Sequence, residues 1–368
     1  MEALSAKPKL RVLLDHLATI KDTRQSWKVA YRLQEVLFLV VCGTIASCDD
    51  YDDIVDWGEA HLSFLRGFAE FYHGIPCADW LRTVMNRIDP DLFAACFSSW
   101  VAECWPDRPD LVAIDGKTSR RSHDRKRGQK ALHLVSAFAT SSRLVLGQEA
   151  VDEKSNEITA IPALLERIDV KGALVSIDAR DAIRTSPRAF SMPKLTTCWR
   201  SRTTSRRFTP TSKAISTQHL PARSNAPRPS ARSTAGSKSE RTPSPIASIG
   251  LLPSAPIRVH PAFQSSLPLP WSRAGSSAAR ALSAAAFAHA VRSHWAIENN
   301  LHWTLDVTFN EDQSRLRAGH GAKNMAVVRH FALNLVRQAT DKRSIKRRRK
   351  RASWDPEYLL QILGPLRC

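Results

Sequence analysis

Two short apolar runs, each ending in an aspartate, constrain the fold of this chain most strongly. LVAID occupies residues 111–115 and ALVSID occupies residues 173–178, and their length and uniform apolarity predict buried β-strands. Open α/β sheets place ligand-binding groups at the carboxyl ends of their strands. Asp115 and Asp178 therefore both stand where a functional site forms in such sheets.

The segment between these runs continues the same pattern. Residues 133–140 and 144–151 resemble a strand pair joined by Ser-Ser-Arg, and residues 157–168 repeat apolar side chains at a helical spacing. The predicted order of elements is β-β-β-α-β. Residues 107–181 are thus predicted to be the first half of an α/β (α+β) domain.

The residues before this domain, 1–106, predict a separate domain made of helices only. Its clearest signal is Asp89-Pro90, an N-cap residue followed by a proline at the first helical position. The helix that begins there is expected to place four side chains on one side: Leu92, Phe93, Cys96 and Trp100.

The chain changes character after Ala179. Most of its 21 prolines lie between Pro187 and Pro270, among many Ser, Thr and Arg residues, and no hydrophobic period survives there. Because this composition buries too little apolar surface to offset its ordering entropy, residues 182–275 are predicted to be a long irregular insert. Helical patterns return at 283–307 and 322–339, so residues 276–368 are predicted to complete the domain. The second of these helices is expected to bury Met325, Val328, Phe331, Ala332 and Leu335.

The net charge of +19 favours a nucleic-acid partner, yet its distribution matters more than its size. The stretch 182–290 holds sixteen basic residues and one acidic residue, so it carries most of the excess. Outside it, the run KRSIKRRRKR at 342–351 is the most concentrated basic segment. This run is the better candidate for contacts with DNA phosphates, and Arg347, Arg348 and Arg349 lie at its centre.

Other classes of protein fit the sequence poorly. The seven cysteines are odd in number and scattered, which argues against a disulfide framework and a zinc ribbon. The longest apolar run, 36–46, is far shorter than the ~18 residues of a membrane span. Residues 1–9 lack the apolar core that is typical of a secretory signal. We therefore expect a soluble protein without membrane contact, in the cytoplasm and associated with the nucleoid.

Three acidic residues suggest a metal-dependent reaction on phosphodiesters. Asp115 and Asp178 end predicted strands, and Glu298 lies in the predicted helix HWAIENNLHW. Hard cations such as Mg²⁺, or Mn²⁺, prefer carboxylate oxygens, and three such ligands leave coordination positions open for water and a phosphate. A strand-end aspartate alone is more often a turn residue, but the joint occurrence of all three favours a site.

Several long motifs resemble one known family. AIDGKT, ALHLVSAFAT, LVLGQEAVDEKSNEITAIPALLE, RSHWAIENNLHWTLDVTFNEDQSRLR and NMAVVRHFALNLVR are similar to insertion-sequence DDE transposases of the H-repeat-associated type. The resemblance covers roughly 1–180 and 277–368. It implies a ribonuclease H-like core with a mixed sheet, preceded by an associated helical domain. It also implies that Asp115, Asp178 and Glu298 bind the catalytic metal and that the substrate is double-stranded DNA at terminal inverted repeats, acted on by a homo-oligomer.

The neighbours of Glu298 allow two interpretations. His294, Glu298 and His302 recur at a spacing of four, which could form a transition-metal site on one helical face. The favoured interpretation instead places Arg292 and His294 near DNA phosphates. Trp295 and Trp303 are expected to pack in the interior, with stacking on a base as the alternative.

Three further polar residues lie in the family-like segments beside the site. Lys117, Lys154 and Asn156 are equally consistent with phosphate contact and with an exposed, solvated position. Base-specific contacts are not indicated by any residue.

The resemblance breaks where the insert begins. In the family, the strand that bears the second aspartate is followed by further sheet and helix, whereas here SIDA runs directly into RDAIRTSPRAF. Our hypothesis is that 180–276 is translated out of frame between two compensating frameshifts. Translating the encoding DNA in the other two frames tests it, because the absence of family-like sequence in both would end the hypothesis. If it holds, cleavage by this copy should be weak or absent.

The sequence therefore predicts an insertion-sequence transposase that cuts and joins DNA at terminal inverted repeats, inactive or weakly active in this copy. Two alternatives stay open. One is a catalytically dead DNA-binding remnant, which would bind DNA without metal and without nicking it. The other is a structure-specific nuclease, which would cut without preference for the ends of the element.

Overall fold

A computed structural model describes residues 8–123, 128, 130–151, 157–178, 196–200 and 284–364. All of them belong to one compact unit, formed by residues 1–202 together with 277–368. The side chains at 157–159, 178, 196–200, 284, 286 and 287 are outside this description.

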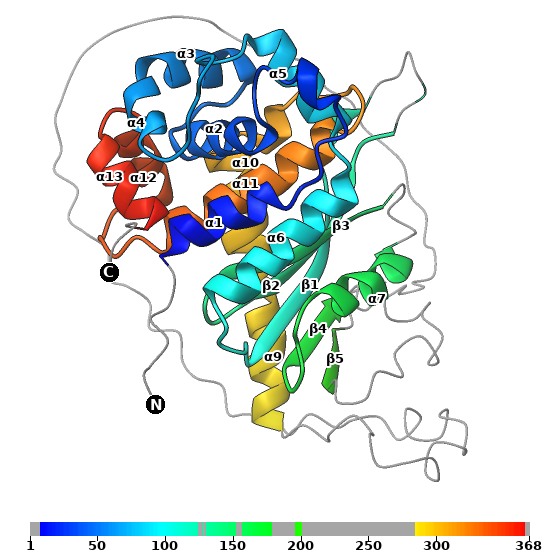
Figure 1. Cartoon of the computed structure of the whole chain (residues 1–368). Coiled ribbons are helices and arrows are strands. Elements are labelled where there is room, and N and C mark those ends of the chain that lie inside the picture. The colour runs from blue at the N-terminus through cyan, green and yellow to red at the C-terminus, as the bar shows by residue number, and fades with distance from the viewer. Residues whose placement is uncertain are drawn as a thin grey trace, which may run out of the picture. The chain divides into compact units, whose positions relative to one another are not determined.

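Helices are the main elements of residues 8–104, as predicted (Figure 1). The helix α2 is apolar on all sides and almost wholly buried, which is the pattern of a helix at the centre of a core. The other helices of this region surround it or extend from it. The elements of this region, α2 included, are α1 (Lys9–Ala18), α2 (Leu33–Ile45), α3 (Tyr51–Ala60), α4 (Leu62–Arg66), α5 (Ala78–Arg87) and α6 (Pro90–Cys104), with a 3₁₀ turn η1 (Ser26–Lys28).

The start of α6 confirms the N-cap prediction. The Asp89 carboxylate accepts hydrogen bonds from the backbone N–H groups of Asp91 and Leu92, and Pro90 occupies the first turn. Phe93, Cys96 and Trp100 are buried as expected. Leu92 was wrongly assigned to the same side, since 54% of it is exposed.

The sheet has the order β3-β2-β1-β4-β5 and mixes both strand orientations. Strand β1 pairs antiparallel with β2, β2 pairs antiparallel with β3, and β4 and β5 are parallel to β1. This confirms the predicted β-β-β-α-β order and the ribonuclease H-like mixed sheet. The elements are β1 (Leu111–Thr118), β2 (His133–Ala139), β3 (Leu144–Val151), α7 (Glu157–Arg167), β4 (Leu174–Asp178) and β5 (Thr196–Arg200), with a 3₁₀ turn η2 (Arg120–Ser122).

Strand β5 was not predicted, because residues 182–275 were expected to be mostly irregular. Its five residues continue the sheet beyond β4, and Leu174 pairs with Thr196 at the start of the ladder. The rest of the insert lies outside the described residues.

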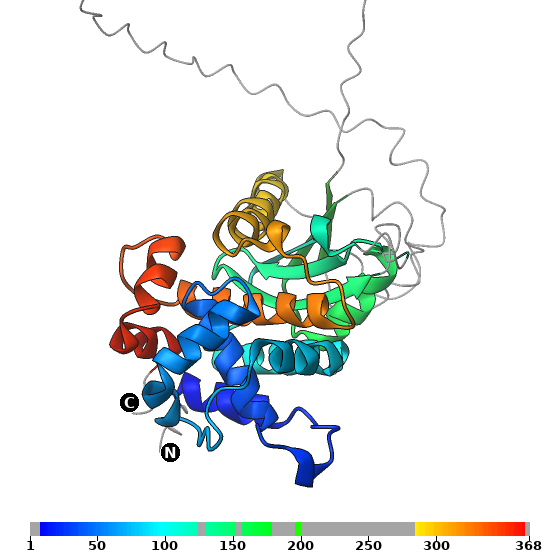
Figure 2. The same cartoon turned by 90° about the horizontal axis from the view of Figure 1, so that it is seen from above.

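Helices cover the two faces of the sheet differently (Figure 2). Val112 and Ile114 of β1 pack with Ile161 and Leu164 of α7 on one face. The alternate residue Leu111 packs with Ala290 of α9 on the other face. Because strand side chains alternate, Asp115 lies on the α9 side, like Leu111. The remaining elements are α9 (Ala284–Ala296), a π-helical segment η8 (Ile297–His302), α10 (Trp303–Thr308), η9 (Glu311–Gln313), α11 (Gly321–Arg337), α12 (Ile345–Ala352) and α13 (Pro356–Leu363).

The long helix α11 ties the helical region to the sheet. The five side chains predicted to face inward are all buried, and Phe331 packs on Phe93 and Phe97 of α6. At the sheet edge the Asn334 amide donates to the carbonyl of Val145 and its oxygen accepts from the Val145 N–H, both at 2.9 Å. These two bonds satisfy backbone groups of an edge strand that would otherwise be open to another chain. A single hydrophobic core therefore crosses the predicted boundary at residue 106.

Among the described residues, no helix is long and apolar enough to cross a membrane.

Candidate functional site

Asp115 and Glu298 meet although they lie far apart in the sequence. The Nδ1 atom of His302 is 3.4 Å from Oε2 of Glu298 and 3.8 Å from Oδ2 of Asp115. One ligand atom from each of the three residues lies within 4.8 Å of the others. The side chain of Glu298 is 45% exposed, whereas those of Asp115 and His302 are 17% and 7% exposed. The cluster is thus buried where Asp115 and His302 lie and open to solvent at Glu298.

The backbone around Glu298 departs from a regular α-helix. Residues Ile297–His302 form a π-helical segment between α9 and α10, so the predicted continuous helix at 283–307 is interrupted by a wider turn. Such segments recur at functional sites, because they change the direction of side chains relative to the preceding turns. Here Ile297 and Leu301 are fully buried, while Glu298 and His302 approach Asp115.

The strand register brings the second aspartate next to the first. Ile114 pairs with Ile177 in the parallel ladder, and Asp115 and Asp178 are the next residues of β1 and β4. The backbone of Asp178 ends β4, but its side chain is not among those described. Adjacent strands thus place the two aspartates side by side. Asp178 ends its strand as predicted, whereas Asp115 was wrongly predicted to end β1, which continues to Thr118.

The cluster of Asp115, Glu298 and His302 fits a divalent cation. Two carboxylates and one imidazole nitrogen converge from a strand and a helix, and the exposed side leaves coordination positions open. The two carboxylates suit magnesium or manganese, whereas imidazole is a ligand that suits zinc better than magnesium. In the sequence His302 was considered with His294 and Glu298 as a site on one helix, whereas the structure joins His302 and Glu298 to Asp115.

Lys117 lies two residues beyond Asp115 on the same face of β1, and both expectations for it are wrong. Its side chain is only 11% exposed. Its Nζ is 2.6 Å from Oδ1 of Asp306 and also pairs with Glu311. On the other side of Glu311, the Nη1 atom of Arg329 is 3.7 Å from Oε1. A buried ionic network therefore ties β1 to α10, η9 and α11 directly beside the cluster.

The charges in this network are strongly coupled. Burial alone would raise the pKa of Glu311, but Lys117 and Arg329 outweigh it and hold the pKa at about 2. Burial would lower the pKa of Lys117, yet its two carboxylate partners raise it above the ordinary value. Burial raises the pKa of Asp306 in spite of its bond to Lys117. Glu311 is thus the carboxylate that keeps its charge most firmly.

The predictions for the face of α9 need correction. His294 is 3% exposed, and its Nδ1 atom lies 3.0 Å from the hydroxyl of Ser176 in β4. It was therefore wrongly placed near DNA phosphates, and the alternative site of His294, Glu298 and His302 on one helix is not formed. Packing was also wrong for the tryptophans, because Trp295 is 46% and Trp303 is 59% exposed.

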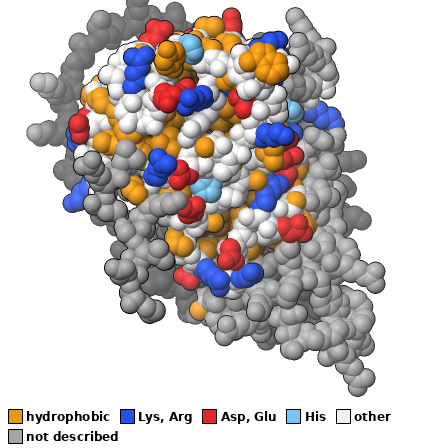
Figure 3. Space-filling model, viewed as in Figure 1, with side chains coloured by type: hydrophobic (Ala, Val, Ile, Leu, Met, Phe, Trp, Pro, Cys, Tyr) orange, Lys and Arg blue, Asp and Glu red, His pale blue; other side chains and the backbone are white. Residues whose placement is uncertain are grey.

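The structure does not test the phosphate contacts predicted for Arg292, Lys154 and Asn156. Arg292 is exposed on α9, so its proposed phosphate contact stays a prediction. Lys154 and Asn156 lie outside the described residues. On the face shown in Figure 3, acidic and basic side chains are interspersed, so the described part of that face offers no broad basic surface.

The basic run at 342–351 does not extend from the fold as a tail. Most of it forms α12, whose arginines divide into buried and exposed ones. Arg348 bonds to the carbonyls of Val336 and Arg337, at 2.9 and 3.2 Å, where α11 ends. Arg349 donates to the carbonyl of Thr44 near the end of α2 and to that of Thr308 at the end of α10.

Arg348 and Arg349 were therefore wrongly predicted to contact DNA. Both act as C-terminal caps, because cationic donors satisfy the last carbonyls of a helix and interact favourably with its dipole. Arg349 is 2% exposed and its guanidinium lies 4.0 Å from the ring centre of Phe309. Arg347 is exposed, so its proposed phosphate contact stays a prediction.

Two arginines of α12, one buried and one exposed, give a matched test of this division. Arg349→Ala removes the caps of α2 and α10, and we expect it to lower the free energy of unfolding by on the order of 2–3 kcal/mol. Arg347→Ala should change it by less than about 0.5 kcal/mol, because that side chain is exposed. Urea unfolding followed by circular dichroism measures both. Equal effects of the two substitutions would contradict the assigned roles.

Two family models together match most of the chain. A family model described as "Transposase DDE domain" matches residues 106–335, and one described as "DDE_Tnp_1-associated" matches residues 14–101. The chain therefore belongs to the DDE transposase family, as its motifs suggested.

Two curated proteins of Escherichia coli are similar to it over nearly their whole length. "H repeat-associated putative transposase YhhI" is 34% identical over 97% of this chain and 98% of the relative. "Putative protein YbfL" is 33% identical with the same coverage. Among solved structures, a piggyBac transposase synaptic complex with hairpin DNA matches 97% of this chain and 79% of that one, at 10% identity and a TM-score of 0.35.

Proposed function

We propose that this protein is a transposase that binds Mg²⁺ or Mn²⁺ through Asp115, Asp178 and Glu298 and acts on double-stranded DNA at terminal inverted repeats. The observation that carries the proposal is the convergence of Asp115 and Glu298, from β1 and η8, beside the strand that ends in Asp178. Family membership supports DNA as the substrate and a divalent cation as the cofactor.

A cation bound there would stabilise the attacking and leaving oxygens of a phosphodiester. The residues of the protein would hold the cation in position. Asp115 is fixed by a strand that pairs on both sides, and Glu298 is fixed by the buried neighbours Ile297 and Leu301. His302 lies between the two carboxylates, so it either completes the ligand set or holds both oxygens in place.

The open side of the cluster faces away from the core, which suits a long polymer better than an enclosed small molecule. Glu298 is the most exposed of the three residues. Arg292 and Arg347 are proposed to contact backbone phosphates around it, because both are exposed cations. We further propose that the protein acts as a homo-oligomer on DNA.

We also propose that cleavage by this copy is weak or absent. The support is the sequence of residues 180–276, which loses the acids, the hydrophobic period and the family motifs that its flanks retain. The described residues do bring Asp115 and Glu298 together across this interval. A catalytic site must be held within ~0.5 Å of its productive geometry, so convergence alone does not ensure turnover.

A cleavage assay on labelled inverted-repeat duplex tests the proposal. With Mg²⁺ or Mn²⁺ we expect DNA binding with little nicking, and loss of any residual nicking in Asp115→Asn. A chain in which 180–276 is replaced by the sequence read in a neighbouring frame should cleave much faster, and only at element ends. Strong cleavage by the unaltered chain would refute the inactivity, and cutting that ignores element ends would favour a nuclease.

A further inference from the structure

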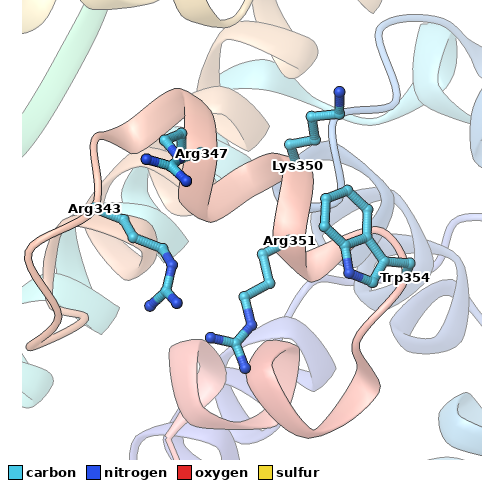
Figure 4. A pocket seen from close by; sticks show the side chains of 5 residues that line it. All are labelled: Arg343, Arg347, Lys350, Arg351 and Trp354. Carbon is cyan, nitrogen blue, oxygen red and sulfur yellow. The ribbon is translucent and has the colours of Figure 1, made fainter.

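The exposed part of the basic segment forms an open pocket with an aromatic wall (Figure 4). Three of its residues belong to α12, one precedes the helix and one follows it. Trp354 is 61% exposed, although a large aromatic side chain usually buries most of its surface. The lining residues are Arg343, Arg347, Lys350, Arg351 and Trp354.

Two of the arginines are held in place by neighbouring acids. Arg343 pairs with Asp341 at 2.9 Å, and Arg351 pairs with Asp355 at 2.8 Å. Both guanidinium groups also lie over the ring of Tyr358, at 5.9 and 4.5 Å from its centre. These contacts fix two sides of the pocket before any ligand arrives.

Arg347 and Lys350 carry the charge that is not compensated. Within the part of the chain that the structure describes, neither side chain forms an ion pair, and both are exposed. The helix itself, IKRRRKRA, holds no acid, and Arg348 and Arg349 anchor it to the core from the opposite side. The pocket therefore offers two available cations beside an exposed indole on a rigid helix.

We propose that this pocket binds an unpaired nucleotide of DNA, with the base stacked on Trp354 and the flanking phosphates on Arg347 and Lys350. The proposal rests on the proposed function for the choice of DNA. Base-aromatic stacking next to a basic groove is the general means of holding single strands, since every base offers a flat face. Bases inside a duplex are already stacked on their neighbours, so an indole at this position favours an unpaired base.

The place of α12 connects the pocket to the candidate active site. Arg349 of α12 bonds to Thr308, which ends α10, and Glu298 lies ten residues earlier on the same run of helix. At the rise of an α-helix, the ten residues from Glu298 to Thr308 span about 15 Å along the helix axis. The contact between α12 and α10 therefore lies within about three helical turns of Glu298.

The test compares single-stranded with duplex DNA in an Asp115→Asn background, where no cutting confuses the binding. The probes are a labelled short oligothymidylate and a labelled inverted-repeat duplex, followed by fluorescence anisotropy. Trp354→Ala should weaken binding of the oligothymidylate about tenfold and leave the duplex nearly unchanged, and Trp354→Phe should restore part of the loss. Trp27→Ala is the matched control, because that indole is 78% exposed on η1, and it should change neither affinity.

The salt dependence of DNA binding tests the roles of Arg347 and Lys350. The double variant Arg347→Ala and Lys350→Ala should reduce the slope of log affinity against log salt for the oligothymidylate by about 1.4, the value for two lost phosphate contacts on a single strand. Thermal melting checks that each variant still folds.

Three results would overturn the proposal. They are an unchanged oligothymidylate affinity in Trp354→Ala, an equal loss for the duplex, and stronger competition by an acidic peptide than by unlabelled oligothymidylate. The outcome is separable from that of the proposed function. A protein that ignores inverted repeats but still binds oligothymidylate through Trp354 would refute the transposase proposal and support the pocket.

Discussion

Glu311→Gln is expected to lower the free energy of unfolding by about 3–5 kcal/mol, because it removes one partner of a buried ionic network. Glu311 is only 2% exposed and sits between Lys117 and Arg329. The isosteric amide keeps the shape of the side chain, but it leaves the buried ammonium with Asp306 alone. Chemical denaturation at neutral pH measures the change, and Glu59→Gln on the exposed face of α3 serves as the matched control.

The loss of stability at low pH should reveal the same interaction of Glu311 with Lys117 and Arg329. The pKa of Glu311 lies at about 2, below the ordinary value of 4.5, so the folded state favours the charged form. Such a group stabilises the fold fully above its unfolded pKa, and the contribution is lost as the pH falls toward the folded pKa. We expect the natural chain to lose about 3 kcal/mol from this group between about pH 5 and pH 2. A Glu311→Gln variant with the same acid sensitivity as the natural chain would contradict this assignment.

Most of the sheet was predictable because its strands are short apolar runs bounded by polar residues. LVAID and ALVSID needed no tertiary information to be recognised as buried strands, although β1 extends three residues beyond its predicted end at Asp115. Strand β5 had no such signal, since TTCWR lies in a segment without any hydrophobic period. Its place in the sheet depends on pairing with β4, which local sequence does not encode.

The candidate site was predictable in part. Asp115 and Glu298 were found through strand ends and family-like motifs, and the structure brings them together. His302 carried a usable signal, because it lies four residues after Glu298, but regular helical geometry also pointed to His294. The π-helical segment decides between the two histidines, and its wider turn was not predicted from the sequence.

The basic run shows why charge patterns mislead. Eight basic residues in ten suggested an exposed tail, and a run with Ile345 as its single apolar side chain gives no sign that any of the basic residues is buried. Arg348 and Arg349 are nevertheless drawn inward, because the ends of α2, α10 and α11 leave carbonyls that need donors. Lys117 is a similar case, since its partners Asp306 and Glu311 lie nearly two hundred residues later in the chain.

Asp115→Asn is expected to weaken binding of Mn²⁺ about a hundredfold or more, and Glu298→Gln to have an effect of similar size. Each substitution removes a charged oxygen ligand from the cluster beside β1, and even a residue that only orients a ligand changes affinity 10- to 100-fold. Isothermal titration with Mn²⁺, or the relaxation of water protons, measures the affinity without requiring cleavage. Glu59→Gln should leave it unchanged.

His302→Ala then separates the two roles open to this residue. A direct ligand should behave like Asp115, whereas a residue that only holds the carboxylates should lose about 10- to 100-fold, with part recovered by His302→Gln. Its Nε2 atom is buried and has no hydrogen-bond partner among the described residues, so the ring is fixed on the Nδ1 side by Asp115 and Glu298 alone. Unchanged Mn²⁺ affinity in both Asp115→Asn and Glu298→Gln would remove the metal site, and with it the structural basis for chemistry on DNA.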